Sequence, residues 1–343
     1  MTTCVAILNW NGIEHLKTYL PSVVKYSTNE SVEILLIDNG STDLSCDWVA
    51  SNYPGVKIKK LDSNYGFAGG YNRGLSDIKS DRIVLLNSDV EVTKGWIDKV
   101  NSTMNDLGLS ACAPRILDHS SPTIFEYAGA SGGYIDKDGF MFCAGRLFDS
   151  FESAEGNYTD DKEVFWASGA ALFIDTIAWQ EIGGLDSDFF AHMEEIDLCW
   201  RLKNRGKKIG VSGGVDVFHL GGGTLSKSSS QKVFLNFRNN LLLLLKNERG
   251  FAPAFIFKRL ILDGIAATRF LLKFEISYSF SIFKAHMAFY SMILSTLRKR
   301  RIELEAQNTH NPNQVGRYKK SIIIDYFFKG KTKFSDLDNT TFV

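Results

Sequence analysis

The chain has 343 residues, of which 44% are hydrophobic and 23% charged, and its formal net charge is zero. These values are typical of a globular protein and exclude an intrinsically disordered chain. The five cysteines are an odd number without CxxC spacing. This pattern argues against a disulfide framework or a zinc site and fits a reducing compartment.

Neither end of the chain carries a recognisable membrane-spanning segment. The N-terminal run MTTCVAILNWNG has no basic stretch before its apolar residues, so we interpret it as a first strand and not as a signal peptide. The longest uncharged run in the C-terminal third is Ala285–Leu297. A spanning helix needs about 20 residues, and we therefore expect no transmembrane segment.

Strand and helix signals alternate along the first part of the chain. Short apolar runs rich in β-branched residues predict the strands VAILNW, VEILLIDNG, VKIKKLD and RIVLLNSDV. Helical patterns between them cover residues 13–26, 43–52 and 70–78. This alternation predicts an α/β fold with a mostly parallel central sheet flanked by helices. In such sheets, ligands bind beyond the carboxyl ends of the strands, where Asp38, Asn64 and Asp89 fall.

The remainder of the chain divides into segments of different character. Residues 111–165 have the pattern of irregular structure with short strands, VFWASGAALFID that of a strand, and residues 176–182 and 194–204 that of helices. The strand KKIGVSG follows, and from Gln231 the chain is helical to about Thr309. We predict a large α/β domain at 1–228, a C-terminal helical region at 229–305 and a polar tail at 306–343.

The predicted C-terminal helices are strongly basic. Residues 246–301 carry eleven basic and three acidic residues, a net charge of +8 that the rest of the chain balances. Phe, Leu and Ile alternate there with spaced Lys and Arg, a pattern typical of amphipathic helices that lie on an anionic membrane surface. The alternative is a set of ordinary helices that pack on the α/β domain or form a dimer, with solvated basic residues.

Two segments offer groups that would bind a nucleotide. Asp38 follows an apolar strand, where its carboxylate would accept the imide N–H of uracil or thymine; the alternative is a strand-end turn, with Asp43 at the start of the next helix. Residues 64–75, NYGFAGGYNRGL, place glycines ahead of a helix, so the backbone can approach a phosphate closely. The segment has neither the GxGxxG spacing of a dinucleotide fold nor the form of a P-loop, and alone it is a weak signal.

Asp89, in the run LLNSDVEV, is the first candidate for a metal ligand. A hard cation such as Mg²⁺ or Mn²⁺ takes one or two carboxylates together with substrate phosphates, and it would neutralise a diphosphate leaving group. His219, in VFHLGGGT, is a candidate second ligand. The alternatives are a turn aspartate satisfied by backbone N–H groups and a packed histidine.

Glu194, Glu195 and Asp197 form an acidic cluster at the start of a predicted helix. Carboxylates in a first helical turn are stabilised by the helix dipole, and Asp197 stands four residues from Arg201, a spacing at which the two would pair. The preceding GGLDSDFFAH is aromatic and Gly-rich, which is typical of a site rim. A carboxylate at this place would deprotonate an acceptor hydroxyl.

Taken in order, these segments resemble family 2 glycosyltransferases, specifically the bacterial rhamnosyltransferase-like branch with the GT-A fold. The resemblance covers residues 4 to about 247 and implies that 1–228 is a GT-A catalytic domain. Each motif alone is weak, and their order and spacing make the match specific. The motifs are VAILNWNG, LLIDNGSTD, NYGFAGGYNRGL, LLNSDVEV, WASGAALFI, GGLDSDFFAHMEEIDLCWRL and HLGGGTLS with FRNNLLLLLKN.

The resemblance implies roles for the matching positions. Asp38 would read the pyrimidine base, and Asp89 matches the last residue of the family's Asp-x-Asp metal motif, in which Asn87 replaces the first Asp. His219 matches a histidine near the diphosphate and the metal. The implied donor-binding residues are Asn9, Asn11, Asp38, Asn64, Gly66, Gly69, Asn87 and Asp89. The implied acceptor side comprises Trp166, Ser168 and Gly169.

The implied base is Glu195, a Glu where the family has an Asp, with Glu194 and Asp197 as neighbouring candidates. The implied reaction is a single displacement that inverts the anomeric centre, with Mg²⁺ or Mn²⁺ stabilising the departing nucleoside diphosphate. A deoxythymidine-diphosphate rhamnose is the favoured donor and a uridine-diphosphate sugar the second choice. The acceptor would be a cell-surface polysaccharide or a lipid-linked glycan.

Two other classes fit the residues less well. A nucleotidyltransferase needs a basic loop to hold a triphosphate, and NYGFAGGYNRGL offers only Arg73. Retention of Asp38, Asp89, Glu195 and His219 argues against an inactive scaffold. We expect a cytoplasmic protein, peripheral on the inner face of the plasma membrane, with no nucleic-acid partner and an oligomeric state left open.

Overall fold

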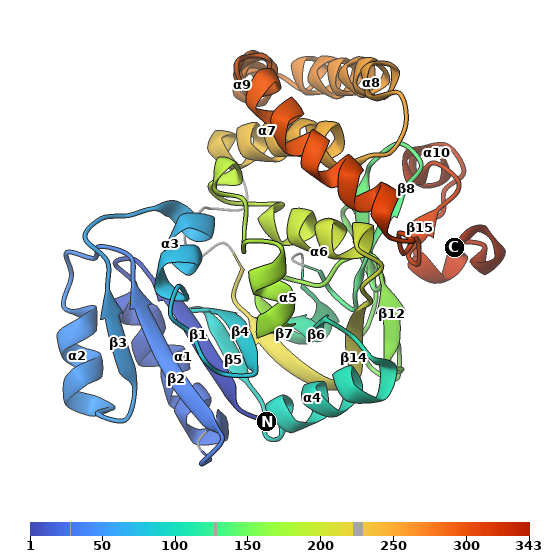
Figure 1. Ribbon diagram of the computed structural model, residues 1–343. Coiled ribbons are helices and arrows are strands. Elements are labelled where there is room, and N and C mark those ends of the chain that lie inside the picture. Colours follow the sequence, from blue (N-terminus) through green and yellow to red (C-terminus); the bar gives the residue numbers. More distant parts are fainter. Residues whose placement is uncertain (28, 127–128, 222–228) are drawn as a thin grey trace.

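The computed structural model describes residues 1–27, 29–126, 129–221 and 229–343, and it shows an α/β body with a layer of helices at one end (Figure 1). Of the motif HLGGGTLS, residues 222–226 lie outside the described residues. All five cysteines are buried and free.

A parallel sheet with interleaved helices makes up the N-terminal part of the body. Its strands lie in the order β3–β2–β1–β4, all parallel. β1 and β4 are buried along most of their length, as expected for central strands with helices on both faces. The predicted α/β fold is confirmed. The bounds are β1 Thr3–Asn9, α1 Ile13–Ser27, β2 Val32–Asp38, α2 Ser45–Asn52, β3 Lys57–Lys60, α3 Gly66–Gly74 and β4 Arg82–Asn87.

The sheet continues past β4 with a change of strand direction. β13 pairs antiparallel with both β4 and β6, and β14 runs parallel to β6. β14 is longer than the predicted strand, and its far end pairs with β5, so that His219 stands opposite Val90. The bounds are β5 Val90–Val92, α4 Trp96–Leu107, β6 Ala111–Asp118, β7 Ser121–Phe125, β12 Lys162–Val164, β13 Ala171–Asp175, α5 Thr176–Glu181, α6 Glu194–Asn204 and β14 Ile209–His219.

A second, smaller sheet lies in the region predicted as irregular structure with short strands, and it takes in the C-terminal segment. β8 to β11 form antiparallel pairs, and β15 from the end of the chain pairs parallel with β8. Tyr318, Ile322 and Phe334 are buried, so the segment expected to be a polar tail is folded against the body. Its buried residues are spaced among charged ones, so the average composition of the segment does not indicate that it packs against the body. The bounds are β8 Gly133–Asp136, β9 Met141–Cys143, β10 Arg146–Leu147, β11 Ser150–Phe151, β15 Arg317–Tyr318 and α10 Ile322–Phe327.

The C-terminal helices are α7 Ser230–Asn247, α8 Ala252–Leu272 and α9 Ile276–Thr309. The second half of α7 contributes Leu241–Leu245 to the core, and α9 packs along α7. α8 and the first half of α9 form the outermost layer (Figure 1). Across the described residues, no helix combines the length and the apolar character needed to cross a bilayer.

Candidate active site

The carboxyl ends of β1 and β2 place Asn9 beside Asp38, because the two residues are paired in the sheet register. Nδ2 of Asn9 donates to Oδ1 of Asp38 (3.3 Å) and to the hydroxyl of Ser45 (2.9 Å). Asn9 and Asp38 are both buried. The Asn9 amide therefore fixes the Asp38 carboxylate at the end of its strand.

Asn11 orders the loop that follows β2. Its backbone is left-handed, with φ of 51°, which Asn tolerates better than most residues. Its Oδ1 accepts from the backbone N–H groups of Thr42 (2.7 Å) and Asp43 (3.3 Å). Asp43 in turn accepts from the N–H groups of Ile13 and Ser45, both at 3.1 Å, at the starts of α1 and α2. Asp43 thus accepts from the first residues of two helices, whereas the sequence indicates only the second.

The Gly-rich segment is held by Asn39, which the sequence reasoning missed. Nδ2 of Asn39 donates to Oδ1 of Asn64 (3.0 Å) and to the carbonyl of Gly66 (3.1 Å). Gly66 has φ of +70°, and a side chain there would meet the ring of Phe190 at 2.6 Å. Gly69 is buried in α3, which begins at residue 66 and not at 70 as predicted. The Gly-rich segment therefore contacts the aromatic segment that precedes α6.

A histidine lies between two carboxylates at the end of β14. Nε2 of His219 is 3.2 Å from Oδ1 of Asp89, and Nδ1 is 3.3 Å from Oε2 of Glu126. The amide nitrogen of Asn87 lies 3.4 Å from the same Nε2. Burial lowers the pKa of His219, but the two carboxylates outweigh it and raise the pKa to about 10. Burial acts to raise the pKa of Asp89, and the contacts with His219 bring it below its ordinary value.

The donor set at Asp89 fits a divalent cation whose other ligands come from the substrate. Within the described ranges, no group of three or more His, Cys, Asp or Glu side chains is arranged as a metal site. Asp89 and His219 offer one carboxylate oxygen and one imidazole nitrogen, 3.2 Å apart. Mg²⁺ is commonly held by one or two carboxylates and substrate phosphates, and such binding would displace the proton from Nε2.

Glu194 and Glu195 begin α6 with carboxylate oxygens that lack partners. Oε2 of each is buried without a hydrogen-bond partner in the part of the chain that the structure describes. Burial raises the pKa of Glu195 to about 7. Burial, together with the charge of Glu195, raises the pKa of Glu194 well above its ordinary value. Unpaired carboxylates whose pKa values are raised toward neutrality are suited to proton transfer.

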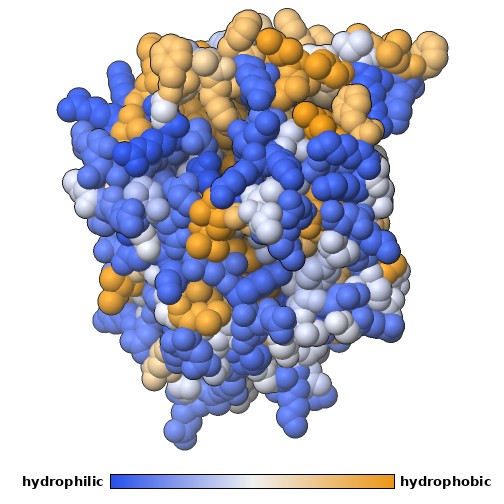
Figure 2. Space-filling view, turned by 90° about the vertical axis from the view of Figure 1, so that its right-hand side faces the viewer, coloured by the Kyte–Doolittle hydropathy of each residue, from blue (hydrophilic) through white to orange (hydrophobic). Residues whose placement is uncertain are grey.

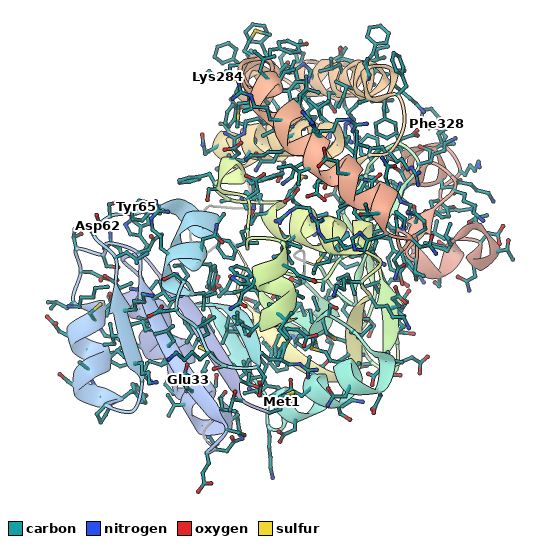
Figure 3. All side chains as sticks on the ribbon, viewed as in Figure 1. Met1, Glu33, Asp62, Tyr65, Lys284 and Phe328 are labelled. Atoms are coloured by element: carbon teal, nitrogen blue, oxygen red, sulfur yellow. The ribbon has the colours of Figure 1, made fainter. Side chains whose placement is uncertain are left out.

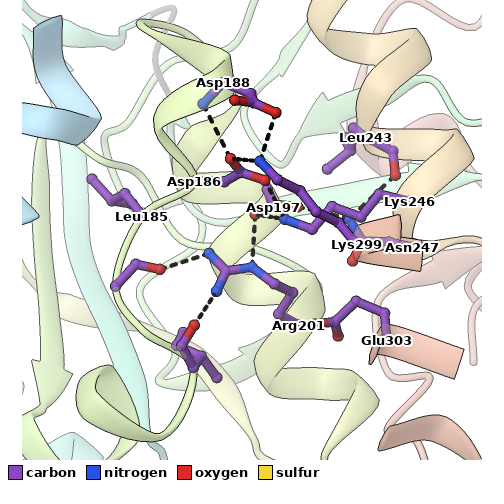
Figure 4. A network of polar contacts seen from close by, with 12 residues as sticks. Leu185, Asp186, Asp188, Asp197, Arg201, Leu243, Lys246, Asn247, Lys299 and Glu303 are labelled. Atoms are coloured by element: carbon purple, nitrogen blue, oxygen red, sulfur yellow. Dashed lines mark hydrogen bonds and ion pairs between the residues drawn. The ribbon is translucent and has the colours of Figure 1, made fainter. Parts of the chain in front are cut away.

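Asp197, the third candidate base, belongs to a network of ion pairs (Figure 4). Its Oδ2 accepts from Arg201 (2.7 Å) and Lys246 (3.0 Å), and its Oδ1 accepts from Asn247 (2.8 Å). Burial opposes ionisation, but Lys246 and Arg201 keep the pKa of Asp197 below its ordinary value. An ionised and fully paired carboxylate is a poor proton acceptor. These contacts support the alternative in which Asp197 pairs with Arg201. They argue against Asp197 as the catalytic base.

The same network fastens the loop before α6 to the C-terminal helices. Lys246 of α7 lies 2.7 Å from Asp186, and Lys299 of α9 lies 2.5 Å from Asp186 and 2.6 Å from Asp188 (Figure 4). The two aspartates flank the start of a short 3₁₀ turn, Ser187–Phe189. The rim predicted from GGLDSDFFAH is therefore positioned by residues that lie far along the chain.

Asn239 of α7 holds the last part of this loop and was also missed by the sequence reasoning. Its amide donates to the carbonyls of Phe189 (3.0 Å), Ala191 (2.8 Å) and His192 (2.7 Å). Phe190 and His192 have left-handed backbones, with φ of 62° and 68°. Such conformations are costly for bulky residues and cluster at functional sites, where surrounding contacts maintain them.

The predicted acceptor side is divided between the core and the site. Trp166 is buried against Gly133, and its Nε1 donates to the carbonyl of Tyr134 (3.1 Å). Ser168 is buried as well. Neither side chain is exposed, so both support the site from within the core and do not line it.

Gly169 is the part of this segment that reaches a candidate base. A side chain at Gly169 would come within 3.2 Å of Cβ of Glu195. The carbonyl of the adjacent Ala170 accepts from the N–H of Asn87 (3.0 Å). Asn87 at the end of β4 is therefore hydrogen-bonded to Ala170, whose neighbour Gly169 contacts Glu195.

Residues 4–155 match the family model described as Glycosyl transferase family 2. The chain is 27% identical over 246 residues to the low-salt glycan biosynthesis hexosyltransferase Agl10 of Haloferax volcanii, which covers 69% of this chain and 74% of that protein. It is 25% identical over 247 residues to the N-acetylglucosaminyl-diphospho-decaprenol L-rhamnosyltransferase of Mycobacterium tuberculosis, which covers 62% of this chain and 72% of that protein.

Solved structures share the fold at low sequence identity. The crystal structure of GalNAc-T7 with UDP, GalNAc and Mn²⁺ matches with a TM-score of 0.54 and 18% identity, over 72% of this chain and 48% of that chain. The mannosyltransferase PcManGT from Pyrobaculum calidifontis, in complex with GDP-Man and Mn²⁺, matches with a TM-score of 0.53 and 10% identity, over 84% of this chain and 86% of that chain.

Proposed function

From the premise that the chain carries a family 2 glycosyltransferase domain with a GT-A fold, we propose that it is an inverting glycosyltransferase with a pyrimidine nucleotide-diphospho-sugar as donor. The observation that carries the proposal is the junction of β4 and β13. The hydrogen bond between Asn87 and Ala170 sets the strand end that leads to Asp89 beside Gly169, which contacts Glu195. The strand end that leads to the candidate metal ligand thus lies next to the segment that contacts the candidate base.

The chemistry follows from these positions. Glu195 takes the proton of the acceptor hydroxyl, the acceptor oxygen forms a bond to C1 of the sugar, and the bond from C1 to the nucleoside diphosphate breaks. A single displacement of this kind inverts C1. Glu194, whose pKa is raised by burial and by the charge of Glu195, carries a proton while Glu195 is ionised, because two adjacent buried carboxylates resist joint ionisation.

The donor is held by the ends of β1, β2 and α3 in this proposal. Asp38, fixed by Asn9, accepts the imide N–H of the base, while the backbone around Asn64 and Gly66 approaches the phosphates. A divalent metal, Mg²⁺ or Mn²⁺, held by Asp89 and His219, would neutralise the charge of the diphosphate. Two solved structures of the same fold contain Mn²⁺, which supports this part of the proposal.

Rhamnose from a deoxythymidine-diphosphate donor is the favoured sugar, supported by the rhamnosyltransferase of Mycobacterium tuberculosis at 25% identity. A uridine-diphosphate sugar is the alternative, because one structure of this fold is with UDP. The proposed acceptor is a hydroxyl of a cell-surface polysaccharide or a lipid-linked glycan. One relative is a hexosyltransferase of glycan biosynthesis, and the other is a rhamnosyltransferase for N-acetylglucosaminyl-diphospho-decaprenol. The proposed location is cytoplasmic, which the five free cysteines favour.

The test is thermal stabilisation of the full chain by thymidine, uridine, guanosine and adenosine diphosphates, with Mn²⁺, with Mg²⁺ and with a chelator. Binding to the folded state raises the melting temperature. A metal-dependent rise with thymidine or uridine diphosphate, absent with the purine nucleotides and lost in Asp38→Ala, supports the proposal. No rise with any nucleoside diphosphate, or an equal rise with all four, contradicts it.

A further inference from the structure

α8 carries apolar residues on both its inner and its outer side. Ala252 and Ile256 are buried on the inner side, together with Arg259, which donates to Asp263 at 2.8 Å. A helix with water on its outer side normally carries polar and charged residues there, and not apolar ones. The exposed apolar residues of this helix, each at least half exposed, are Phe257, Ile261, Ile265, Leu271 and Leu272.

The first half of α9 also carries apolar residues on both its inner and its outer side. The residues buried between this half of α9 and the protein are Ser279, Ser281, Ile282, Ala285 and Phe289. Phe274, in the turn that joins the two helices, is 89% exposed. The outer stripe follows helical spacing and consists of Ile276, Phe280, Phe283, Met287, Tyr290 and Leu294.

Together these two stripes and Phe274 form one surface, which we call the docking face. Figure 2 shows the apolar surface gathered at the helical end of the molecule, above a mainly hydrophilic body. Single exposed apolar residues are ordinary on protein surfaces, but a continuous patch of this kind marks a contact site.

The exposed charges around the docking face are all basic. Asp263 is buried and Glu275 is half-buried, so neither presents a fully exposed negative charge. Lys284 and Phe328 project at the helical end, while Met1 and Glu33 lie at the opposite end (Figure 3). Within residues 252–298, the exposed charged residues are Lys258, Arg269, Lys273, Lys284 and Arg298.

We propose that the docking face binds the anionic surface of a lipid bilayer. Apolar side chains on a surface helix enter the boundary between headgroups and acyl chains, and neighbouring Lys and Arg attract anionic headgroups. A second copy of the chain is a poorer occupant, because a symmetric contact would bring two basic surfaces together. Since no described helix is able to span a bilayer, the helices lie on its surface.

The test is co-sedimentation of the full chain with vesicles of phosphatidylcholine alone and of phosphatidylcholine mixed with phosphatidylglycerol. We expect binding to the mixed vesicles, weaker binding to the neutral ones, and release by salt, because surface electrostatics are screened. The triple variant Phe280→Gln, Phe283→Gln, Leu294→Gln should lose at least about tenfold in vesicle affinity. The variant Lys273→Gln, Lys284→Gln should lose the preference for anionic lipid.

The matched control is Ile177→Gln with Phe151→Gln, which replaces exposed apolar residues of the body and should leave vesicle binding unchanged. Binding to neither vesicle, or equal binding to both, overturns the proposal. The proposal is also overturned if the parent chain fails to bind vesicles but sediments as a dimer, while the triple variant sediments as a monomer. Nucleotide binding and melting temperature, measured on the same samples, separate this outcome from a failure of the proposed function or of folding.

Discussion

Glu126 contacts His219 on the side of the ring opposite Asp89, with Oε2 of Glu126 3.3 Å from Nδ1. A carboxylate on one ring nitrogen fixes the tautomer and leaves the other nitrogen free for a metal. We therefore assign Glu126 a positioning role. Glu126→Gln should weaken metal-dependent binding of the nucleoside diphosphate by about 10–100-fold, the usual effect of losing such a partner.

The measurement for Glu126→Gln is titration calorimetry of the nucleoside diphosphate at several Mn²⁺ concentrations. A shift of the Mn²⁺ dependence, with an unchanged melting temperature without metal, distinguishes positioning from a purely structural role. Glu91→Gln is the matched control, because Glu91 also pairs with a histidine, His119 at 3.1 Å, but is half exposed. Equal effects of the two variants would count against the assignment.

Replacement of the candidate base should separate binding from turnover. Glu195→Gln keeps the shape of the side chain but cannot take a proton, so the transfer rate should fall by about 10²–10⁴-fold while nucleotide binding survives. The measurement is the single-turnover rate beside the affinity for the nucleoside diphosphate. Glu181→Gln, an exposed carboxylate on α5, is the control. Near-normal turnover of Glu195→Gln would move the role to Glu194.

The rate should rise with pH across neutrality. Burial raises the pKa of Glu195 to about 7, and the base acts in its ionised form, which is depleted below that pH and complete above it. On the acid side the single-turnover rate should therefore increase about tenfold per pH unit and then level off. The residual rate of Glu195→Gln should not show this rise on the acid side of the pH profile. A flat profile of the parent enzyme from about pH 5.5 to 8.5 would contradict the assignment.

The contact between Gly66 and Phe190 yields a prediction with an internal control. Gly66 and Gly95 have nearly the same φ, +70° and +77°, but a side chain at Gly95 meets nothing within 4 Å. Alanine at either site incurs the backbone cost of about 1–2 kcal/mol. Only Gly66→Ala also displaces Phe190, so it should lower stability further and weaken nucleotide binding.

The melting temperature and the nucleoside-diphosphate affinity of both glycine variants are the measurements. Adding Phe190→Ala to Gly66→Ala should recover part of the loss, because it removes the ring that the new methyl group meets. Indistinguishable effects of Gly66→Ala and Gly95→Ala would mean that the contact has no energetic weight.

The parts of the site that follow strands and begin helices could be predicted from the sequence. Asp38 and Asn87 end apolar runs, and parallel pairing brings such ends to one edge. α6 begins and ends where its acidic start and apolar period predict. These features are local, because each depends on a few neighbouring residues.

The supporting residues could not be predicted, because tertiary contacts alone define them. Glu126 is separated from His219 by 93 positions, and Asn239 from Phe189 by 50. Glu126 stands in no motif, and Asn239 lies in the motif FRNNLLLLLKN, which does not indicate the loop that it holds. The burial of Trp166 in the core is also set by tertiary contacts. The packing of the C-terminal segment could not be predicted, because its few buried aromatic residues are diluted among charged ones.

α9 is one unbroken helix that carries Leu294 of the outer stripe and, a little further on, Lys299, which contacts Asp186 and Asp188. With a rise of 1.5 Å per residue, the two points are about 8 Å apart along the axis. Because α9 would lie on the bilayer, this distance runs parallel to the lipid surface. The same unbroken helix would hold the catalytic loop beside the lipid, so an acceptor hydroxyl near its lipid anchor would be favoured over the far end of a long glycan.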